Sequence, residues 1–169
     1  MTEKKVVFKG KLLKIYTAKR KLSNGYTVYL EIVEHPGAAL VIPFLTKDKI
    51  ILLKQFRPVI NSHIYELPAG TIQKGESLIN CVKREIIEEI GYSAKKITKL
   101  GAIFPVPGYS TERITIFKAE QLIQRERDCQ EDEIIKTIII DRRRVRKFFK
   151  SGKIVDAKTI CAFSMCGWL

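Results

Sequence analysis

The sequence predicts an α/β sandwich built on a mixed β-sheet, with an extra β unit at the N-terminus. Most apolar stretches are short and bounded by turn residues, as in strands. Ser77–Ile90 has helical periodicity instead, and two shorter helical segments follow near the end of the chain. The chain has 169 residues, of which 46% are hydrophobic, so we expect one principal core.

The first part of the chain has the pattern of a β-hairpin. Two strand-like stretches, Val6–Tyr16 and Tyr26–Val33, flank Ser23-Asn24-Gly25, whose composition is typical of a tight turn. We therefore expect residues 1–37 to form an N-terminal β unit and residues 38–169 to form the main domain.

The main domain begins with further strand signals. Ala38–Leu45 and Ile50–Gln55 are joined by a polar turn and predict a hairpin that enters the core. Ile64–Leu67 then leads into a Pro-Ala-Gly loop. Later strands are expected at Lys99–Phe104, Ile114–Ala119 and Ile134–Ile140.

Three helices are predicted. Between Ser77 and Ile90 the isoleucines and valines recur every three or four residues, and Gly91 is a typical helix stop. The other two helices are expected over Arg142–Lys150 and Ala157–Cys166. Strands interleaved with helices in this way favour a sandwich built on a mixed sheet.

The net charge of +13 favours anionic partners: nucleic acid, an anionic membrane or a phosphorylated small molecule. A lysine-rich solvated surface would give the same charge. Apart from Arg142–Lys150 the basic residues are dispersed, and no aromatic RNA-binding motif is present, so a nucleic-acid partner is not expected.

Cysteine spacing and hydropathy exclude other classes. The four cysteines form no CxxC pair, and His35 and His63 are the only histidines, so we expect neither structural zinc nor a disulfide framework. The apolar runs are too short to span a bilayer, and no leader pattern is found. We expect a cytoplasmic protein without a membrane partner.

Three carboxylates indicate a metal site. Glu85, Glu88 and Glu89 lie at i, i+3 and i+4, so a helix places them on one face, where like charges repel. A hard divalent cation such as Mg²⁺ would make this arrangement favourable, since it prefers oxygen ligands. The alternative is an ordinary solvated face balanced by Lys83 and Arg84.

The surrounding residues favour the metal site. From Gly70 to Tyr92 the chain matches the pattern Gx5Ex7REUxEExGU at every position, where U is apolar or aromatic. The chain therefore resembles the Nudix hydrolases. Flanking segments are similar to the ADP-ribose pyrophosphatase branch of that family: Gln55-Phe56-Arg57, Glu66-Leu67-Pro68-Ala69-Gly70 and Pro107-Gly108-Tyr109-Ser110-Thr111-Glu112.

This resemblance implies a Nudix-type α/β/α sandwich and a set of roles. Mg²⁺, for which Mn²⁺ can substitute, would be bound by Ala69, Glu85, Glu88, Glu89 and Glu133. Arg84 would orient the glutamates. The general base would be Glu131, on the loop before the last predicted strand, with Glu112 as the competing candidate. Substrate contacts are expected from Arg57, Glu66, Pro107 and Gly108.

The resemblance also implies a reaction and an assembly. The enzyme would cleave the diphosphate of a nucleoside diphosphate derivative, with ADP-ribose giving AMP and ribose 5-phosphate as the first choice. GDP-mannose, another nucleotide-sugar or a dinucleotide is the alternative substrate. A non-enzymatic module that senses nucleotides or binds nucleic acid is the alternative class. The N-terminal β unit would exchange between subunits of a homodimer.

Overall fold

The computed structural model describes residues 4–127 and 134–169. The chain divides into two compact units, each with its own internal contacts. The first consists of Met1–Gly37 and Phe104–Arg113, and the second of Ala38–Ile103 and Ile114–Leu169. The segment Phe104–Arg113 thus groups with the N-terminal strands, although it lies far from them in the sequence.

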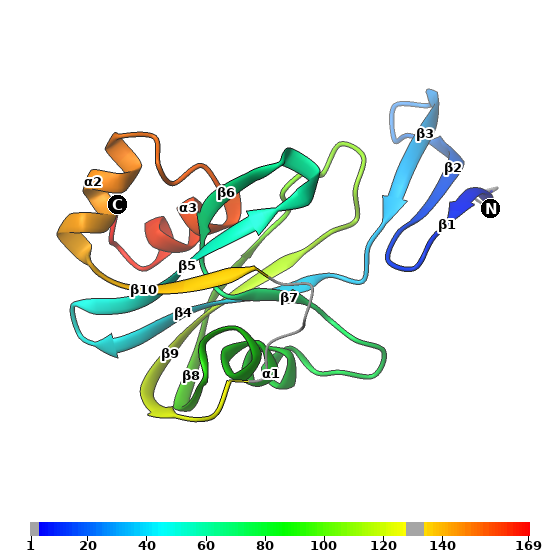
Figure 1. The fold of residues 1–169 in the computed structure, drawn as a ribbon. Helices are drawn as coiled ribbons and strands as arrows, with labels where there is room; N and C mark the ends of the chain where they lie inside the picture. The colour runs from blue at the N-terminus through cyan, green and yellow to red at the C-terminus, as the bar shows by residue number, and fades with distance from the viewer. Residues whose placement is uncertain (1–3, 128–133) are drawn as a thin grey trace. The chain divides into compact units, whose positions relative to one another are not determined.

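The first unit is a three-stranded antiparallel sheet with the order β1-β2-β3 (Figure 1). Its strands are β1 (Lys4–Lys9), β2 (Lys14–Lys21) and β3 (Thr27–Glu34). Hydrogen bonds between Val33 and the backbone of Tyr109 and Thr111 attach the later segment to β3 (2.8 and 3.0 Å). The small core of this unit contains Tyr16, Ala18 and Ile32.

The prediction of one strand over Val6–Tyr16 was wrong. The chain turns where the amide of Gly10 donates to the carbonyl of Leu13 (2.8 Å), and β2 then continues to Lys21. The second half of β2 is rich in lysine and arginine because its outer residues are solvent-exposed, so it lacks the apolar run that marks a strand. The predicted turn at Ser23-Asn24-Gly25 is confirmed, and Gly25 has a φ of +88°.

The second unit contains a seven-stranded sheet with the central order β10-β5-β4-β9-β8, in which β6 pairs with β5 and β7 pairs with β4. Among these pairs β4 and β9 are parallel and the others antiparallel, which makes the sheet mixed. Its strands are β4 (Ala38–Thr46), β5 (Lys49–Arg57), β6 (Ser62–Glu66), β7 (Ala69–Thr71), β8 (Tyr92–Ile103), β9 (Ile114–Gln124) and β10 (Ile135–Asp141), and a short 3₁₀ turn, η1 (Pro58–Ile60), follows β5.

Helices cover both faces of this sheet. The helices are α1 (Leu78–Ile90), α2 (Arg142–Lys150) and α3 (Ala157–Met165). Alternate residues of β4 point to opposite faces. Val41 packs in a cluster with Ile86 of α1, whereas Leu40 packs in a second cluster with Phe163 of α3. Figure 1 shows α1 on one side of the sheet and α2 and α3 on the other. The predicted α/β/α sandwich is confirmed.

The helix boundaries follow from their caps. The Ser77 hydroxyl accepts a hydrogen bond from the amide of Asn80 (3.2 Å), and Gly91 ends α1 with a φ of +71°. Asp141 and Asp156 cap α2 and α3 in the same way. The three predicted helices are therefore found within one residue of their expected bounds. None of the helices in the described part of the chain is long and apolar enough to cross a membrane.

Candidate active site

The carboxylates of α1 are held against β7 by close backbone packing. Glu85 and Glu89 are buried, with 7% and 2% of their surface exposed. A Cβ atom at Gly70 would lie 1.5 Å from Oε1 of Glu85, so only glycine leaves room for that carboxylate. The amide of Ala69 donates a hydrogen bond to Oε2 of Glu89 (3.1 Å). Strand β7 therefore fixes two of the predicted metal ligands.

Arg84 gathers the remaining carboxylates of the box. Its guanidinium donates to Glu76 (Nε to Oε1, 2.9 Å), Glu85 (Nη1 to Oε1, 2.5 Å) and Glu88 (Nη1 to Oε2, 2.9 Å). It also reaches the carbonyl of Thr71 at 3.3 Å. The hydrogen bond to Glu76 and the surrounding carboxylates raise the pKa of Arg84, and the hydrogen bond from Arg84 lowers the pKa of Glu76. Arg84 thus lies where the resemblance expected an orienting residue.

The donor set of this helix suits a hard divalent cation. It consists of the carboxylates of three glutamates, of which two are buried next to the backbone of β7. Burying like charges so close together costs free energy unless cations compensate them. Within residues 4–127 and 134–169, however, no three acidic, histidine or cysteine side chains are already gathered as a coordination sphere. In the structure Arg84 bonds to Glu85 and Glu88, two of the three glutamates on this helix.

A third buried carboxylate lies on β6. Glu66 is 1% exposed and receives two hydrogen bonds from Arg57 (Nε to Oε1, 2.6 Å; Nη2 to Oε2, 2.7 Å). Lys158 of α3 also bonds to Glu66 and to Asp156, the latter at 2.8 Å. Burial raises the pKa of Glu66, but the hydrogen bonds from Arg57 and the charge of Lys158 outweigh it and hold the pKa below its usual value.

Lys158 was missed by the sequence analysis. A lone lysine in a short helix carries no periodic signal. The neighbouring Thr159 is fully buried, and its hydroxyl accepts a hydrogen bond from the amide of Leu67 (2.9 Å). The first turn of α3 therefore supports the segment that leads from β6 to Ala69.

The remaining candidates belong to other segments of the chain than α1 and β6. In the first unit, Glu112 faces His35 (Oε1 to Nδ1, 3.8 Å), and its amide donates to the hydroxyl of Ser110 (3.1 Å). Pro107 and Gly108 belong to the same segment, Phe104–Arg113. Glu131 and Glu133 lie outside the described residues. The choice between Glu131 and Glu112 as general base stays a prediction.

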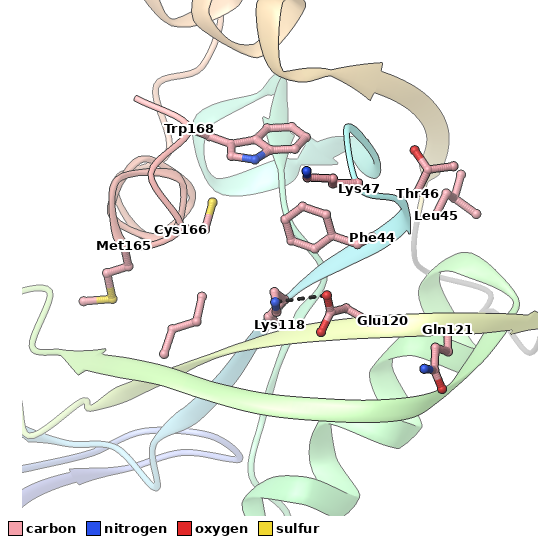
Figure 2. Close-up of a pocket in the computed structure, with 11 residues that line it drawn as sticks. Phe44, Leu45, Thr46, Lys47, Lys118, Glu120, Gln121, Met165, Cys166 and Trp168 are labelled. Carbon is pink, nitrogen blue, oxygen red and sulfur yellow. Dashed lines mark ion pairs between the residues drawn. The ribbon is translucent and has the colours of Figure 1, made fainter.

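The main unit also has a cavity of about 780 Å³, which no box glutamate lines. Figure 2 shows residues that line it. The rings of Phe44 and Trp168 line it, together with the ion pair between Lys118 and Glu120 (3.0 Å). Phe44 and Trp168 belong to the apolar cluster on the α3 side of the sheet. None of the sequence-predicted site residues lines this cavity.

Comparison with known proteins agrees with the fold and the box. The family profile described as NUDIX domain matches residues 34–159. The chain belongs to the Nudix family.

Two relatives and one solved structure are similar to most of the chain. An ADP-ribose pyrophosphatase of Bacillus subtilis is 38% identical over 161 residues, covering 94% of this chain and 87% of its own. A methanol dehydrogenase activator of Bacillus methanolicus is 33% identical over 158 residues, covering 92% and 85%. A solved structure titled as that of an ADP compounds hydrolase superposes with a TM-score of 0.83 at 21% identity, covering 97% of this chain and 89% of that one. The predicted membership in the Nudix hydrolases is confirmed.

Proposed function

We propose that this Nudix hydrolase cleaves ADP-ribose into AMP and ribose 5-phosphate. In this reaction a water oxygen forms a bond to one phosphorus, the bond from that phosphorus to the bridging oxygen breaks, and two protons are released. The observation that supports the proposal most is the complete box in one folded arrangement, with Gly70, Arg84 and three glutamates brought together. The B. subtilis relative, named as an ADP-ribose pyrophosphatase, supports the substrate.

Nudix ADP-ribose pyrophosphatases generally depend on a divalent metal. For this chain we propose Mg²⁺, with Mn²⁺ as a substitute. Glu85, Glu88 and Glu89, with the Ala69 carbonyl and Glu133, would hold it. When bound, the ion neutralises phosphate charge and lowers the pKa of a coordinated water. Arg84 keeps the box carboxylates aligned through the hydrogen bonds described above.

Arg57 is the proposed contact to a phosphate or to the terminal ribose. Its guanidinium is aligned by Glu66, and a guanidinium can offer a second set of donors to an anion. Lys158 supports this role because its positive charge also compensates the buried Glu66 carboxylate. Arg57 is therefore not the sole counter-charge of Glu66 and can also contact substrate. Pro107 and Gly108 are further proposed substrate contacts.

Proton removal from the attacking water needs a base outside the metal ligands. We propose Glu131, with Glu112 as the rival. Glu112 is 3.8 Å from His35, a contact that suits a structural role as well as a catalytic one.

We further propose that residues 1–37 take part in a homodimer. The three-stranded sheet of the first unit has a core of three buried residues, so it buries little apolar surface by itself. Light scattering at micromolar concentration tests this idea, and a fully active monomer would remove it.

A substrate panel tests the proposed function. The panel consists of ADP-ribose, GDP-mannose, NADH, diadenosine polyphosphates and capped RNA, each assayed with Mg²⁺. The values of kcat/KM are compared between substrates, and the products of each reaction are identified. ADP-ribose should have the highest kcat/KM. A higher value for GDP-mannose would move the chain to another substrate class, and the absence of turnover on every compound would favour a binding module.

A further inference from the structure

One short segment near the C-terminus is strongly basic. Residues 142–153 contain seven lysines and arginines and no aspartate or glutamate. Its charge of +7 compares with a net charge of +13 for the whole chain. Six of the seven lie on α2, whose N-cap is Asp141. A charge density of this kind generates a strong local positive potential.

Two of these arginines have a role in the fold. Arg142 donates to the carbonyl of Gly167, and Arg146 donates to the carbonyl of Trp168 (2.9 Å). These bonds tie α2 to the C-terminal residues. The helix therefore presents its remaining charges from a fixed position.

Two more cations lie over a buried ring. Arg144 and Lys153 are 5.3 and 5.2 Å from the ring centre of Phe148. Phe148 is 8% exposed and belongs to the main apolar cluster, as does Val145. The apolar residues Val145 and Phe148 are therefore committed to the core and are unavailable for insertion into a bilayer.

The other three cations form an exposed row. Arg143, Lys147 and Lys150 lie at i, i+4 and i+7 on one face, about 6 and 4.5 Å apart along the helix axis. With Arg146 and Ser151 they line a groove of about 470 Å³. In the part of the chain that the structure describes, none of the three forms an ion pair with a carboxylate. This exposed row can therefore bind a linear polyanion.

An aromatic ring lies next to the row. Phe149 is 41% exposed and, with Arg146, Lys150 and Leu169, lines a second groove of about 340 Å³. Single-stranded nucleic acids are commonly bound by a basic groove along the backbone and by aromatic rings on which bases stack. The combination of an exposed ring and a basic row distinguishes α2 from a merely solvated lysine-rich surface.

We propose that α2 is a binding surface for single-stranded nucleic acid. Phosphates lie along Arg143, Lys147 and Lys150, and one base stacks on Phe149. Because α2 covers the face of the sheet opposite α1, this surface is separate from the proposed metal site on α1. The proposal departs from the sequence prediction, which rested on the absence of a known motif and could not show which cations the fold leaves exposed.

The first experiment compares two triple variants with the same loss of charge. One is R143Q/K147Q/K150Q, and the control is K95Q/K99Q/K136Q, which removes three exposed lysines of β8 and β10. Binding of a fluorescent single-stranded RNA and DNA is measured by anisotropy at several salt concentrations. The slope of log K against log salt is negative, and each lost phosphate contact reduces its magnitude by about 0.7. The slope of the α2 variant should therefore be smaller in magnitude by about 2. The control should retain the wild-type slope.

The outcomes of this experiment are decisive. Equal weakening in both variants would mean that net charge alone attracts the probe, and it would overturn the proposal. Binding to anionic vesicles without binding to RNA or DNA would also overturn it. Both variants should hydrolyse ADP-ribose as the wild type does, which shows that they are folded. If the wild type itself lacks that activity, circular dichroism replaces it as the folding control, and the binding result still stands.

A second experiment tests the stacking contact. Phe149→Ala should weaken binding about five-fold or more at constant salt without changing the salt slope, because stacking on a ring involves no counterion release. Ile139→Ala, at a residue that is 59% exposed on β10, is the matched control. Unchanged affinity in Phe149→Ala would remove the base from the proposal and reduce it to a generic polyanion surface, which would contradict it.

Discussion

Helices α1 and α2 cover opposite faces of the same sheet and differ in the burial and pairing of their charged side chains. On α1 the carboxylates of Glu85 and Glu89 are buried, and Arg84 bonds to three glutamates. On α2 the charged side chains are exposed, and none bonds to a carboxylate of the described residues.

The two helices differ in the free energy needed to remove their charged groups from water. Moving a carboxylate out of water costs several kcal/mol unless hydrogen bonds and opposite charges compensate it. A cation that stays in water has almost no such cost. Charges that are retained despite burial therefore indicate chemistry inside the fold, whereas exposed charges indicate contact with a partner or with solvent.

The largest expected effect concerns a buried charge of α1. Glu89→Gln removes one charge with little change in shape, so it should lower kcat by at least about 100-fold while the fold remains. Steady-state kinetics with a Mg²⁺ titration measures the loss, and circular dichroism measures the fold. Lys83→Gln, an exposed site on the same helix, is the control and should remain active. Normal kcat in Glu89→Gln would remove α1 from the mechanism.

The second prediction concerns the general base. If Glu131 is the base, Glu131→Gln should reduce kcat by about 10²- to 10⁴-fold with little change in KM, because a base acts in the transition state. Glu112→Gln should cost far less. The acidic limb of the pH–rate profile should also flatten in the Glu131 variant. A near-normal Glu131→Gln enzyme beside an impaired Glu112→Gln one would transfer the role to Glu112.

The third prediction concerns the close approach of β7 to α1. Gly70→Ala places a methyl group 1.5 Å from the Glu85 carboxylate in the native geometry, so the strand or the side chain must move. We expect a loss of about 1–3 kcal/mol in the free energy of unfolding, measured by urea denaturation. The double variant Gly70→Ala/Glu85→Ala removes the clash and should recover stability. If the double variant is no more stable than the single one, the clash is not the cause.

The smallest expected effect concerns the pH dependence of stability. The folded pKa of Glu66 lies below its unfolded value, so its ion pairs stabilise the protein above the unfolded pKa of about 4.3. That contribution is lost as the pH falls from there through the folded pKa. In Glu66→Gln the free energy of unfolding should therefore depend less on pH below about 4.3. An unchanged profile would mean that the pair with Arg57 and Lys158 does not persist in solution.

Much of the catalytic helix could be predicted from the sequence because its signals are local. The spacing of apolar residues fixed the bounds of α1, and Ser77 and Gly91 marked its ends. The spacing of the glutamates likewise showed that they share one face. Arg84 was assigned through the family resemblance, and its bonds to Glu85 and Glu88 are local to the same helix.

The features that were missed depend on contacts between distant parts of the chain. Lys158 and Glu66 are 92 positions apart, and their pairing depends on how α3 packs beside β6. The grouping of Phe104–Arg113 with β3 rests on backbone hydrogen bonds to Val33, which no side-chain pattern encodes. The break between β1 and β2 was missed because the apolar pattern continues across the turn at Gly10.

Product analysis tests the central claim that the buried charges of α1 form a metal-dependent hydrolytic site. ADP-ribose is incubated with the wild-type protein and Mg²⁺, with and without a chelator, and the products are separated by chromatography. We predict equal amounts of AMP and ribose 5-phosphate with Mg²⁺, no turnover with chelator, and recovery when Mg²⁺ or Mn²⁺ is restored. Full activity in the presence of chelator, or no cleavage of ADP-ribose under any condition, would contradict the account.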